Sequence, residues 1–223
     1  MSQAETHRAT IEGAAGAIEI AYALPAHPAA VAVVAHPHPL FGGAMENKVV
    51  TTVARAFVQA GAATFRFNFR GVGASEGAHD EGRGETDDFL EVAAHAARTV
   101  GEVPLWMAGF SFGGGVALRA STRTPFAQLV LVAPALRRIT GHGLGEPPDP
   151  GDPGLGAAGR HGPANTVVVH GDRDDTVPLA DSLAWGEARD VPVLVIPGAD
   201  HFFHRKLHVI RDLVGRLVRP AGA

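Results

Sequence analysis

Residues 103–114, Val-Pro-Leu-Trp-Met-Ala-Gly-Phe-Ser-Phe-Gly-Gly, join a short apolar run to the pattern G-x-S-x-G, which places Ser111 between two glycines. The apolar run predicts a buried strand over 104–109, and the small residues that follow predict a helix over 112–122. A Ser at such a strand–turn–helix corner is held on a tight bend with its hydroxyl pointing outward. Ser111 is therefore a candidate nucleophile. The alternative is a Gly-rich turn in which Ser111 only caps the helix.

Similar apolar runs, separated by helix-like segments, lie on both sides of this corner. The predicted strands are 16–22, 30–35, 62–69, 104–109, 127–132, 165–170 and 192–196, and the predicted helices are 46–60, 85–100, 112–122, 179–188 and 203–218. Continuous apolar strands interleaved with helices predict an α/β fold, with a mostly parallel central sheet and helices on both faces. Ligands of such sheets bind beyond the carboxyl ends of the strands, which is where Ser111 is expected.

One segment breaks this alternation. Residues 139–164 are rich in Gly and Pro and fall between two predicted strands. The composition is that of a surface loop, and the position would also suit a lid over the site. A length of 223 residues predicts a single domain that spans 1–223.

The composition excludes several classes of function. With 46% hydrophobic and 19% charged residues and a formal charge of −4, the chain has no basic footprint for nucleic acid or an anionic membrane. The absence of Cys excludes disulfides, a thiol nucleophile and thiolate metal sites. Residues 1–8 contain no apolar signal core, and no apolar run is long enough to span a membrane. We therefore expect a cytoplasmic protein; nothing in the sequence indicates its oligomeric state.

A nucleophilic Ser needs a general base, and the base needs an orienting carboxylate. Asp172, Asp174 and Asp175 directly follow the strand predicted over 165–170, and His201 follows the last predicted strand. These loops are expected at the same edge of the sheet as Ser111. His201 is thus the predicted base. The residues alone leave three candidates for the acid.

These motifs together resemble the α/β-hydrolase superfamily over nearly the full chain, with Ser, Asp and His in the order which that fold uses. The stretch Asn-Phe-Arg-Gly-Val-Gly-Ala-Ser-Glu-Gly at 68–77 is similar to the family's loop after an early strand. Residues 35–43, Ala-His-Pro-His-Pro-Leu-Phe-Gly-Gly, are similar to a group of small bacterial hydrolases related to dienelactone hydrolase. Those relatives have little or no cap domain. Dienelactone hydrolase itself uses Cys where this chain has Ser111.

The resemblance implies roles for individual residues. The family pattern G-x-x-D-x-x-V-P selects Asp174 as the acid beside His201 and Ser111. The tetrahedral oxyanion needs two N–H donors, and the backbone N–H after the nucleophile, that of Phe112, is one of them. The second is expected in the loop after the strand predicted over 30–35. Because prolines in this loop have no N–H, His38 and Leu40 remain as candidates.

We therefore expect a serine hydrolase, carboxylesterase-like, that cleaves an ester or another activated acyl bond of a small molecule through an acyl-enzyme. Neither a cofactor nor a metal is expected for this chemistry, and His204 and His208 are interpreted as helix-face residues. Phe41, Phe110 and Phe202 are expected to line an apolar acyl pocket because they lie beside the motifs. The alternatives are a serine peptidase of the same fold and a non-catalytic protein of this fold that binds a small ligand.

Overall fold

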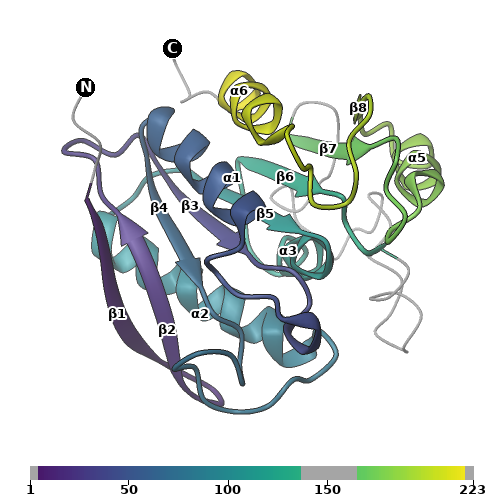
Figure 1. Cartoon of the computed structure of the whole chain (residues 1–223). Coiled ribbons are helices and arrows are strands. Elements are labelled where there is room, and N and C mark those ends of the chain that lie inside the picture. The colour runs from purple at the N-terminus through teal and green to yellow at the C-terminus, as the bar shows by residue number, and fades with distance from the viewer. Residues whose placement is uncertain (1–4, 137–164, 219–223) are drawn as a thin grey trace.

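A computed structural model describes residues 5–136 and 165–218, so the segment 139–164 lies outside the described part (Figure 1). Its centre is an eight-stranded sheet in the order β1-β2-β4-β3-β5-β6-β7-β8. The strands are β1 (Thr6–Gly13), β2 (Gly16–Ala23), β3 (Ala30–Ala35), β4 (Ala62–Phe67), β5 (Leu105–Phe110), β6 (Gln128–Val132), β7 (Thr166–Gly171) and β8 (Val193–Ile196). The pairs β1/β2 and β2/β4 are antiparallel, and the remaining pairs are parallel. The predicted α/β fold with a mostly parallel sheet is thus confirmed.

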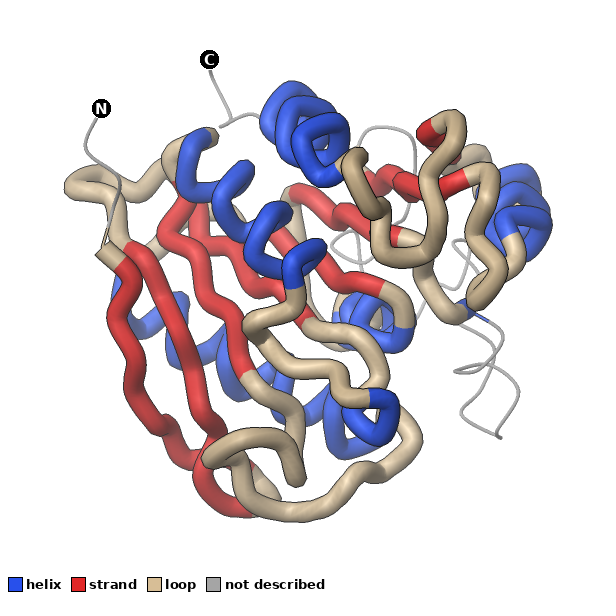
Figure 2. The backbone as a smooth tube through the Cα atoms, viewed as in Figure 1, coloured by secondary structure: helices blue, strands red, loops and turns tan. Residues whose placement is uncertain are grey.

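Helices cover both faces of this sheet (Figure 2). They are α1 (Lys48–Gln59), α2 (Arg83–Val100), α3 (Phe112–Ala120), α5 (Leu179–Glu187) and α6 (Leu207–Leu217), with a short 3₁₀ helix, η1 (Pro39–Phe41). Val31 and Val33 of β3 point to the face that α2 and α3 cover, whereas Ala32 and Val34 point to the face of α1 and α6. Side chains alternate along a strand, so a strand buried on both faces must be apolar at every position, as β3 is.

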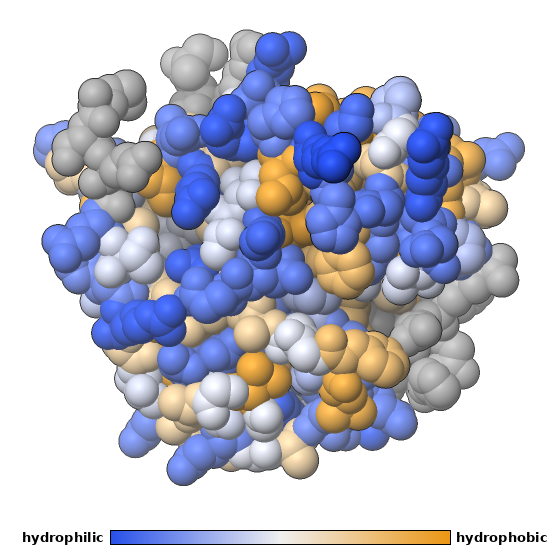
Figure 3. Space-filling model, viewed as in Figure 1, coloured by the Kyte–Doolittle hydropathy of each residue, from blue (hydrophilic) through white to orange (hydrophobic). Residues whose placement is uncertain are grey.

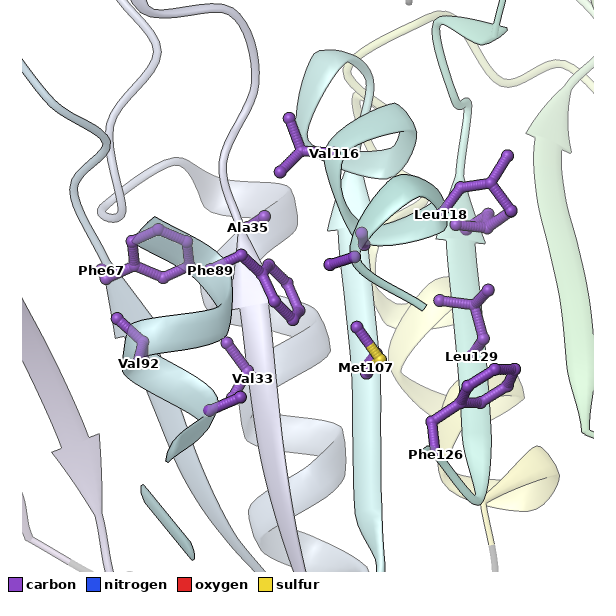
Figure 4. Packing of buried hydrophobic residues seen from close by; sticks show 14 of the residues in the cluster. Val33, Ala35, Phe67, Phe89, Val92, Met107, Val116, Leu118, Phe126 and Leu129 are labelled. Carbon is purple, nitrogen blue, oxygen red and sulfur yellow. The ribbon is translucent and has the colours of Figure 1, made fainter. Parts of the chain in front are cut away.

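The core on the α2 and α3 face contains large aromatic side chains (Figure 4). Phe67 of β4 and Phe89 of α2 are fully buried, and their rings meet edge to face with centroids 5.9 Å apart. Burying one such side chain stabilises a fold by about 1.5–3 kcal/mol. Met107 of β5, the strand that leads to Ser111, is also fully buried in this core. This packing gives the strand ends a rigid base.

Two elements differ from the sequence expectation. The strand β1 was not predicted; it pairs with β2 as a hairpin at the edge of the sheet, where most of its polar side chains face solvent. The last helix was predicted from residue 203, but α6 begins at Leu207. Phe203 and Arg205 adopt φ angles of 54° and 61°, which an α-helix does not allow.

The parallel strands end at one edge of the sheet, and the loops after β3, β5, β7 and β8 meet there (Figure 1). At the opposite end of the strands, β1 begins at Thr6, which pairs with the end of β2 at Ala23. Helix α6 runs back from the loop after β8 and also ends at this opposite end. The described part of the chain therefore begins and ends on the side away from the strand ends that carry the chemistry.

Candidate active site

Ser111 forms the corner between β5 and α3. Its φ of 55° and ψ of −118° lie outside the regions that a residue with a side chain normally adopts. The corner is held by the Ser111 N–H, which donates to the Val132 carbonyl at 2.9 Å, and by the Ser111 carbonyl, which accepts from the Ala135 N–H at 2.9 Å. Strained backbone of this kind persists only where the surroundings enforce it, and it concentrates at functional sites.

Two glycines of the motif let the backbone pack this closely. A Cβ on Gly109 would lie 2.0 Å from the carbonyl oxygen of Gly113, so strand and helix could not approach as they do. A Cβ on Gly113 would lie 2.4 Å from the carbonyl oxygen of His36, in the loop after β3. The glycines therefore bring that loop against the start of α3.

His201, in the loop after β8, lies between Ser111 and an aspartate. Its Nε2 is 3.0 Å from the Ser111 Oγ, and its Nδ1 is 2.7 Å from Oδ2 of Asp174. Because a carboxylate only accepts, Nδ1 carries the hydrogen, and the lone pair on Nε2 accepts from the Ser111 hydroxyl. The imidazole packs on the ring of Phe110 with centroids 4.9 Å apart. This tautomer is the one that a general base acting on Ser111 requires.

The geometry selects one of the three candidate aspartates. Asp174 Oδ1 accepts from the backbone N–H groups of Thr176 at 2.9 Å and Val177 at 2.8 Å, while Oδ2 faces His201. Asp172 instead accepts from the Gly198 N–H. Asp175 is exposed and contacts Thr176. Only Asp174 among the three reaches the imidazole.

The environment keeps Asp174 ionised. Burial of the side chain raises the pKa of this carboxyl, but hydrogen bonds from His170, His201 and the Val177 N–H outweigh burial, and the pKa is held well below its usual value. A carboxylate that stays charged stabilises an imidazolium beside it. The electrostatics thus suit the step in which His201 takes up a proton.

The loop after β3 is fixed by His36. His36 is fully buried, its Nδ1 lies 2.6 Å from the Pro37 carbonyl, and its Nε2 accepts from the Phe69 N–H at 3.0 Å. Nδ1 therefore carries the hydrogen, since the carbonyl can only accept. Burial lowers the pKa of His36 to about 4, so the ring is neutral at neutral pH.

The same loop carries both candidates for the second oxyanion donor. The N–H of Leu40 already donates to Nδ1 of His38 at 3.3 Å, in the bond that caps η1. The His38 ring lies 4.8 Å from the Phe112 ring, so this part of the loop packs on the first residue of α3. The Phe112 N–H itself starts α3 and has no acceptor four residues back within the helix. This arrangement favours His38 over Leu40 as the partner of Phe112.

The three predicted pocket residues differ in exposure. Phe41 is 76% exposed and Phe202 is 46% exposed, on loops that flank the Ser111 corner. Figure 3 shows apolar side chains gathered on the surface over η1. Phe110 is only 1% exposed and lies behind the His201 ring. Phe110 therefore supports the imidazole, and Phe41 and Phe202 remain candidates for substrate contact.

One of the two histidines interpreted as helix-face residues lies before the last helix. His204 lies in the turn before α6, not on the helix face, and its Nδ1 is 2.7 Å from Asp200 Oδ2. Within residues 5–136 and 165–218, no group of three or more His, Asp or Glu is arranged to hold a metal ion. None of the helices in this described part is long and apolar enough to cross a membrane.

Sequence reasoning missed His170, a fully buried side chain at the end of β7. Its Nε2 lies 3.2 Å from Oδ2 of Asp174. His36 holds the equivalent place directly after β3. A polar residue at the end of an otherwise apolar buried strand is the signal that both share, because a buried imidazole must find hydrogen-bond partners.

Comparisons with known proteins agree with this fold. The family model described as serine aminopeptidase, S33, matches residues 26–147. An alpha-beta serine hydrolase homologue from Coxiella burnetii is 34% identical and superposes with a TM-score of 0.78, covering 94% of this chain and 96% of that one. XC6422 from Xanthomonas campestris, described as an a/b serine hydrolase without lid, is 34% identical with a TM-score of 0.82, covering 98% and 97%.

A curated relative extends the likeness beyond solved structures. The uncharacterized protein RP471 of Rickettsia prowazekii is 33% identical over 212 residues, which cover 87% of this chain and 81% of that protein. The similar structures are α/β serine hydrolases, and the family model covers more than half of the chain. The chain therefore belongs to this family of α/β-hydrolases.

Proposed function

We propose that this protein is a serine hydrolase that cleaves ester or other activated acyl bonds of a small molecule, with Ser111 as the nucleophile. Membership of a hydrolase family supports hydrolysis as the general reaction. The observation that carries the specific proposal is the hydrogen-bond chain from Ser111 Oγ to His201 Nε2, 3.0 Å, and from His201 Nδ1 to Asp174 Oδ2, 2.7 Å. A binding module has no need of this chain on a strained Ser.

The chemistry follows from the positions of the protons. As Ser111 Oγ attacks the acyl carbonyl carbon, His201 Nε2 takes the hydroxyl proton, and Asp174 stabilises the imidazolium. The N–H groups of Phe112 and His38 would stabilise the oxyanion, each by about 10²–10³ in rate. The imidazolium then protonates the leaving alcohol or amine. In the second half a water loses a proton to His201 and attacks the acyl carbon of the acyl-enzyme. The bond from this carbon to Ser111 Oγ then breaks, and His201 returns the proton to Oγ as the acid leaves.

The surface around Ser111 suits an apolar acyl group. Leu40 and Phe41 of η1 are 70% and 76% exposed, and Phe202 lies next to the base. Exposed apolar side chains beside a nucleophile exclude water from a bound substrate and contribute binding energy. We therefore infer an ester of a small to medium apolar acid as the substrate.

A second candidate is peptide hydrolysis at a free amino terminus. The observation in its favour is the matched family's description as serine aminopeptidase, S33. The same three side chains would carry that reaction, since acyl transfer from an amide also proceeds through an acyl-enzyme. Recognition of an α-ammonium group would require an acidic or carbonyl-rich subsite in addition.

The test measures hydrolysis of p-nitrophenyl esters from acetyl to octanoyl, and of aminoacyl p-nitroanilides, by the wild type and Ser111→Ala. Fluorophosphonate labelling with peptide mapping accompanies it, and circular dichroism checks that the variant is folded. We expect ester turnover that is lost in Ser111→Ala, with the label on Ser111. Anilide turnover exceeding ester turnover would select the peptidase. Folded wild type that neither labels nor turns over would overturn the proposal.

A further inference from the structure

The carboxylate of Asp174 contacts a second imidazole besides His201. Its Oδ2 lies 2.7 Å from Nδ1 of His201 and 3.2 Å from Nε2 of His170. The side chains of Asp174 and His170 are both fully buried. With the N–H groups of Thr176 and Val177 on Oδ1, the carboxylate has four donors around its two oxygens. An ionised carboxylate has about four lone-pair sites, so its accepting capacity is filled.

The contacts of His170 determine its tautomer. Nε2 faces the Val177 carbonyl at 3.0 Å as well as Asp174 Oδ2, and both of these groups only accept. Nε2 therefore carries a hydrogen. Nδ1 lies 2.8 Å from the hydroxyl of Ser182, a fully buried residue of α5. A hydroxyl can donate, so Ser182 satisfies the lone pair on Nδ1 and keeps the hydrogen on the side of Asp174.

We propose that His170 is a positioning residue for the catalytic acid: its Nε2–H holds Oδ2 of Asp174 in place beside His201, and Ser182 fixes the His170 tautomer. This inference rests on the proposed function of Ser111. A chain of polar contacts then extends from Ser182 through His170, Asp174 and His201 to the nucleophile. It couples helix α5, on one face of the sheet, to the reacting edge.

The second imidazole also divides the charge of the carboxylate. Among the described residues, the titratable side chains in hydrogen-bond contact with Asp174 are His170 and His201. Without the His170 donor, the carboxylate would direct more of its negative charge to His201 alone. An opposite charge nearby favours the protonated form of an imidazole. Loss of His170 should therefore lower turnover and also move the acid limb of the pH profile.

The central experiment compares His170→Leu with His170→Gln in ester hydrolysis. We expect kcat to fall about tenfold in His170→Leu at little change in KM, the size expected for losing one hydrogen bond to a charged group. The acid limb of kcat/KM should move to higher pH. The side-chain amide of Gln can donate an N–H to Asp174, so His170→Gln should keep kcat and the acid limb of kcat/KM close to their wild-type values. His208→Leu, the same change at an exposed position of α6, should leave both at wild-type values.

Ser182→Ala tests the tautomer separately. We expect a fall in kcat of about threefold, smaller than in His170→Leu because the carboxylate still favours a hydrogen on Nε2. If His170→Leu does not fold, this variant and His170→Gln decide the matter. A kcat lowered about threefold in Ser182→Ala beside a near-wild-type kcat in His170→Gln supports the proposal, and an unchanged kcat in Ser182→Ala overturns it.

Proton NMR gives a readout that needs no turnover. The His201 Nδ1–H that donates to Asp174 should give a far-downfield resonance, and losing the competing His170 donor should move it further downfield. If the wild type cleaves and labels nothing, the proposed function fails, and this resonance still tests the role of His170. An unshifted resonance in folded His170→Leu, with unchanged kcat and acid limb where turnover is measurable, would reduce His170 to a packing residue.

Discussion

A fully buried histidine lies at the carboxyl end of β7 and another directly follows β3, and the two carry their hydrogen on opposite nitrogens. His36 holds its hydrogen on Nδ1, gives it to the Pro37 carbonyl and accepts from the Phe69 N–H. His170 holds its hydrogen on Nε2, directed at Asp174 and the Val177 carbonyl. Both side chains are 0% exposed, so burial does not distinguish them. Their partners do.

The two histidines therefore contribute to the site in different ways. His36 ties backbone to backbone, so the loop with the candidate oxyanion donors keeps its path only while this ring is neutral. His170 ties a carboxylate to a helix, so it acts on charge as well as on position. A buried polar group rigidifies a site when all of its partners are present, and each loop follows this rule through different atoms.

The largest expected effect comes from the β7 loop. In Asp174→Asn, the backbone N–H groups on Oδ1 should keep the amide oxygen in its place, so the amide NH₂ faces His201. A donor in that position forces the hydrogen of His201 onto Nε2, where it cannot act as a base for Ser111. We expect kcat for a p-nitrophenyl ester to fall about 10⁴-fold. The neighbouring exposed Asp175→Asn is the matched control and should keep wild-type kcat.

A substitution that displaces the β3 loop should lower kcat less than Asp174→Asn does. In Gly113→Ala the new Cβ would lie 2.4 Å from the His36 carbonyl oxygen, so the loop must move away from the start of α3. Displacing one oxyanion donor should lower kcat about 10²–10³-fold while leaving the His201 tautomer intact. Gly215→Ala on α6, where a Cβ meets nothing within 4 Å, is the control for the same substitution. Equal kcat in both variants would remove the loop from the mechanism.

The buried groups of the two loops should contribute differently to the free energy of unfolding as the pH falls. The pKa of His36 is about 4 in the fold and 6.5 in the unfolded chain, so the unfolded state binds more protons between these values. The free energy of unfolding should therefore fall as pH drops from 6.5 to 4, by about 3 kcal/mol from this group. The pKa of Asp174 is lowered, so its contribution is kept in this window and lost only at lower pH.

His36→Gln isolates this contribution, because Gln can still accept from the Phe69 N–H but cannot titrate in this range. Urea unfolding at pH 7, 6, 5 and 4 should give a flatter pH dependence for the variant than for the wild type. Parallel losses in the two proteins would mean that another group controls acid stability.

The smallest effect concerns substrate preference. Phe41 belongs to η1 in the β3 loop and is 76% exposed, so its truncation should not destabilise the fold. If it contacts the acyl chain, Phe41→Ala should lower kcat/KM for the octanoyl ester about tenfold and change the acetyl ester little. Leu183→Ala, an exposed apolar position on α5, should change neither. An unchanged ratio of octanoyl to acetyl kcat/KM in Phe41→Ala would place the acyl chain elsewhere.

The sequence predicted the sheet and the nucleophile corner because both depend on local patterns. Apolar runs mark strands that are buried on both faces, and G-x-S-x-G marks the bend. The strand β1 was not predicted because its polar side chains, which face solvent at the outer edge of the sheet, give no apolar run. The late start of α6 escaped because the left-handed φ angles of Phe203 and Arg205 have no signal in residues of these types.

Only those site residues that belong to motifs in a characteristic order could be predicted from the sequence. Ser111, Asp174 and His201 came from the order of motifs and the resemblance to a known family, and the structure brings these three side chains into one hydrogen-bond chain. The contacts of His36 with Phe69 and of His170 with Ser182 join residues that only the folded sheet brings together. No local pattern encodes such a pair.

The position of β1 and α6 has a practical consequence for handling the protein. Strand β1 begins, and helix α6 ends, at the sheet edge opposite to Ser111. An affinity tag, a fluorophore or a resin linkage attached before β1 or after α6 therefore joins the described part of the chain on the side away from Ser111. Immobilised on a bead by one end, the enzyme should present its reacting edge to the solution.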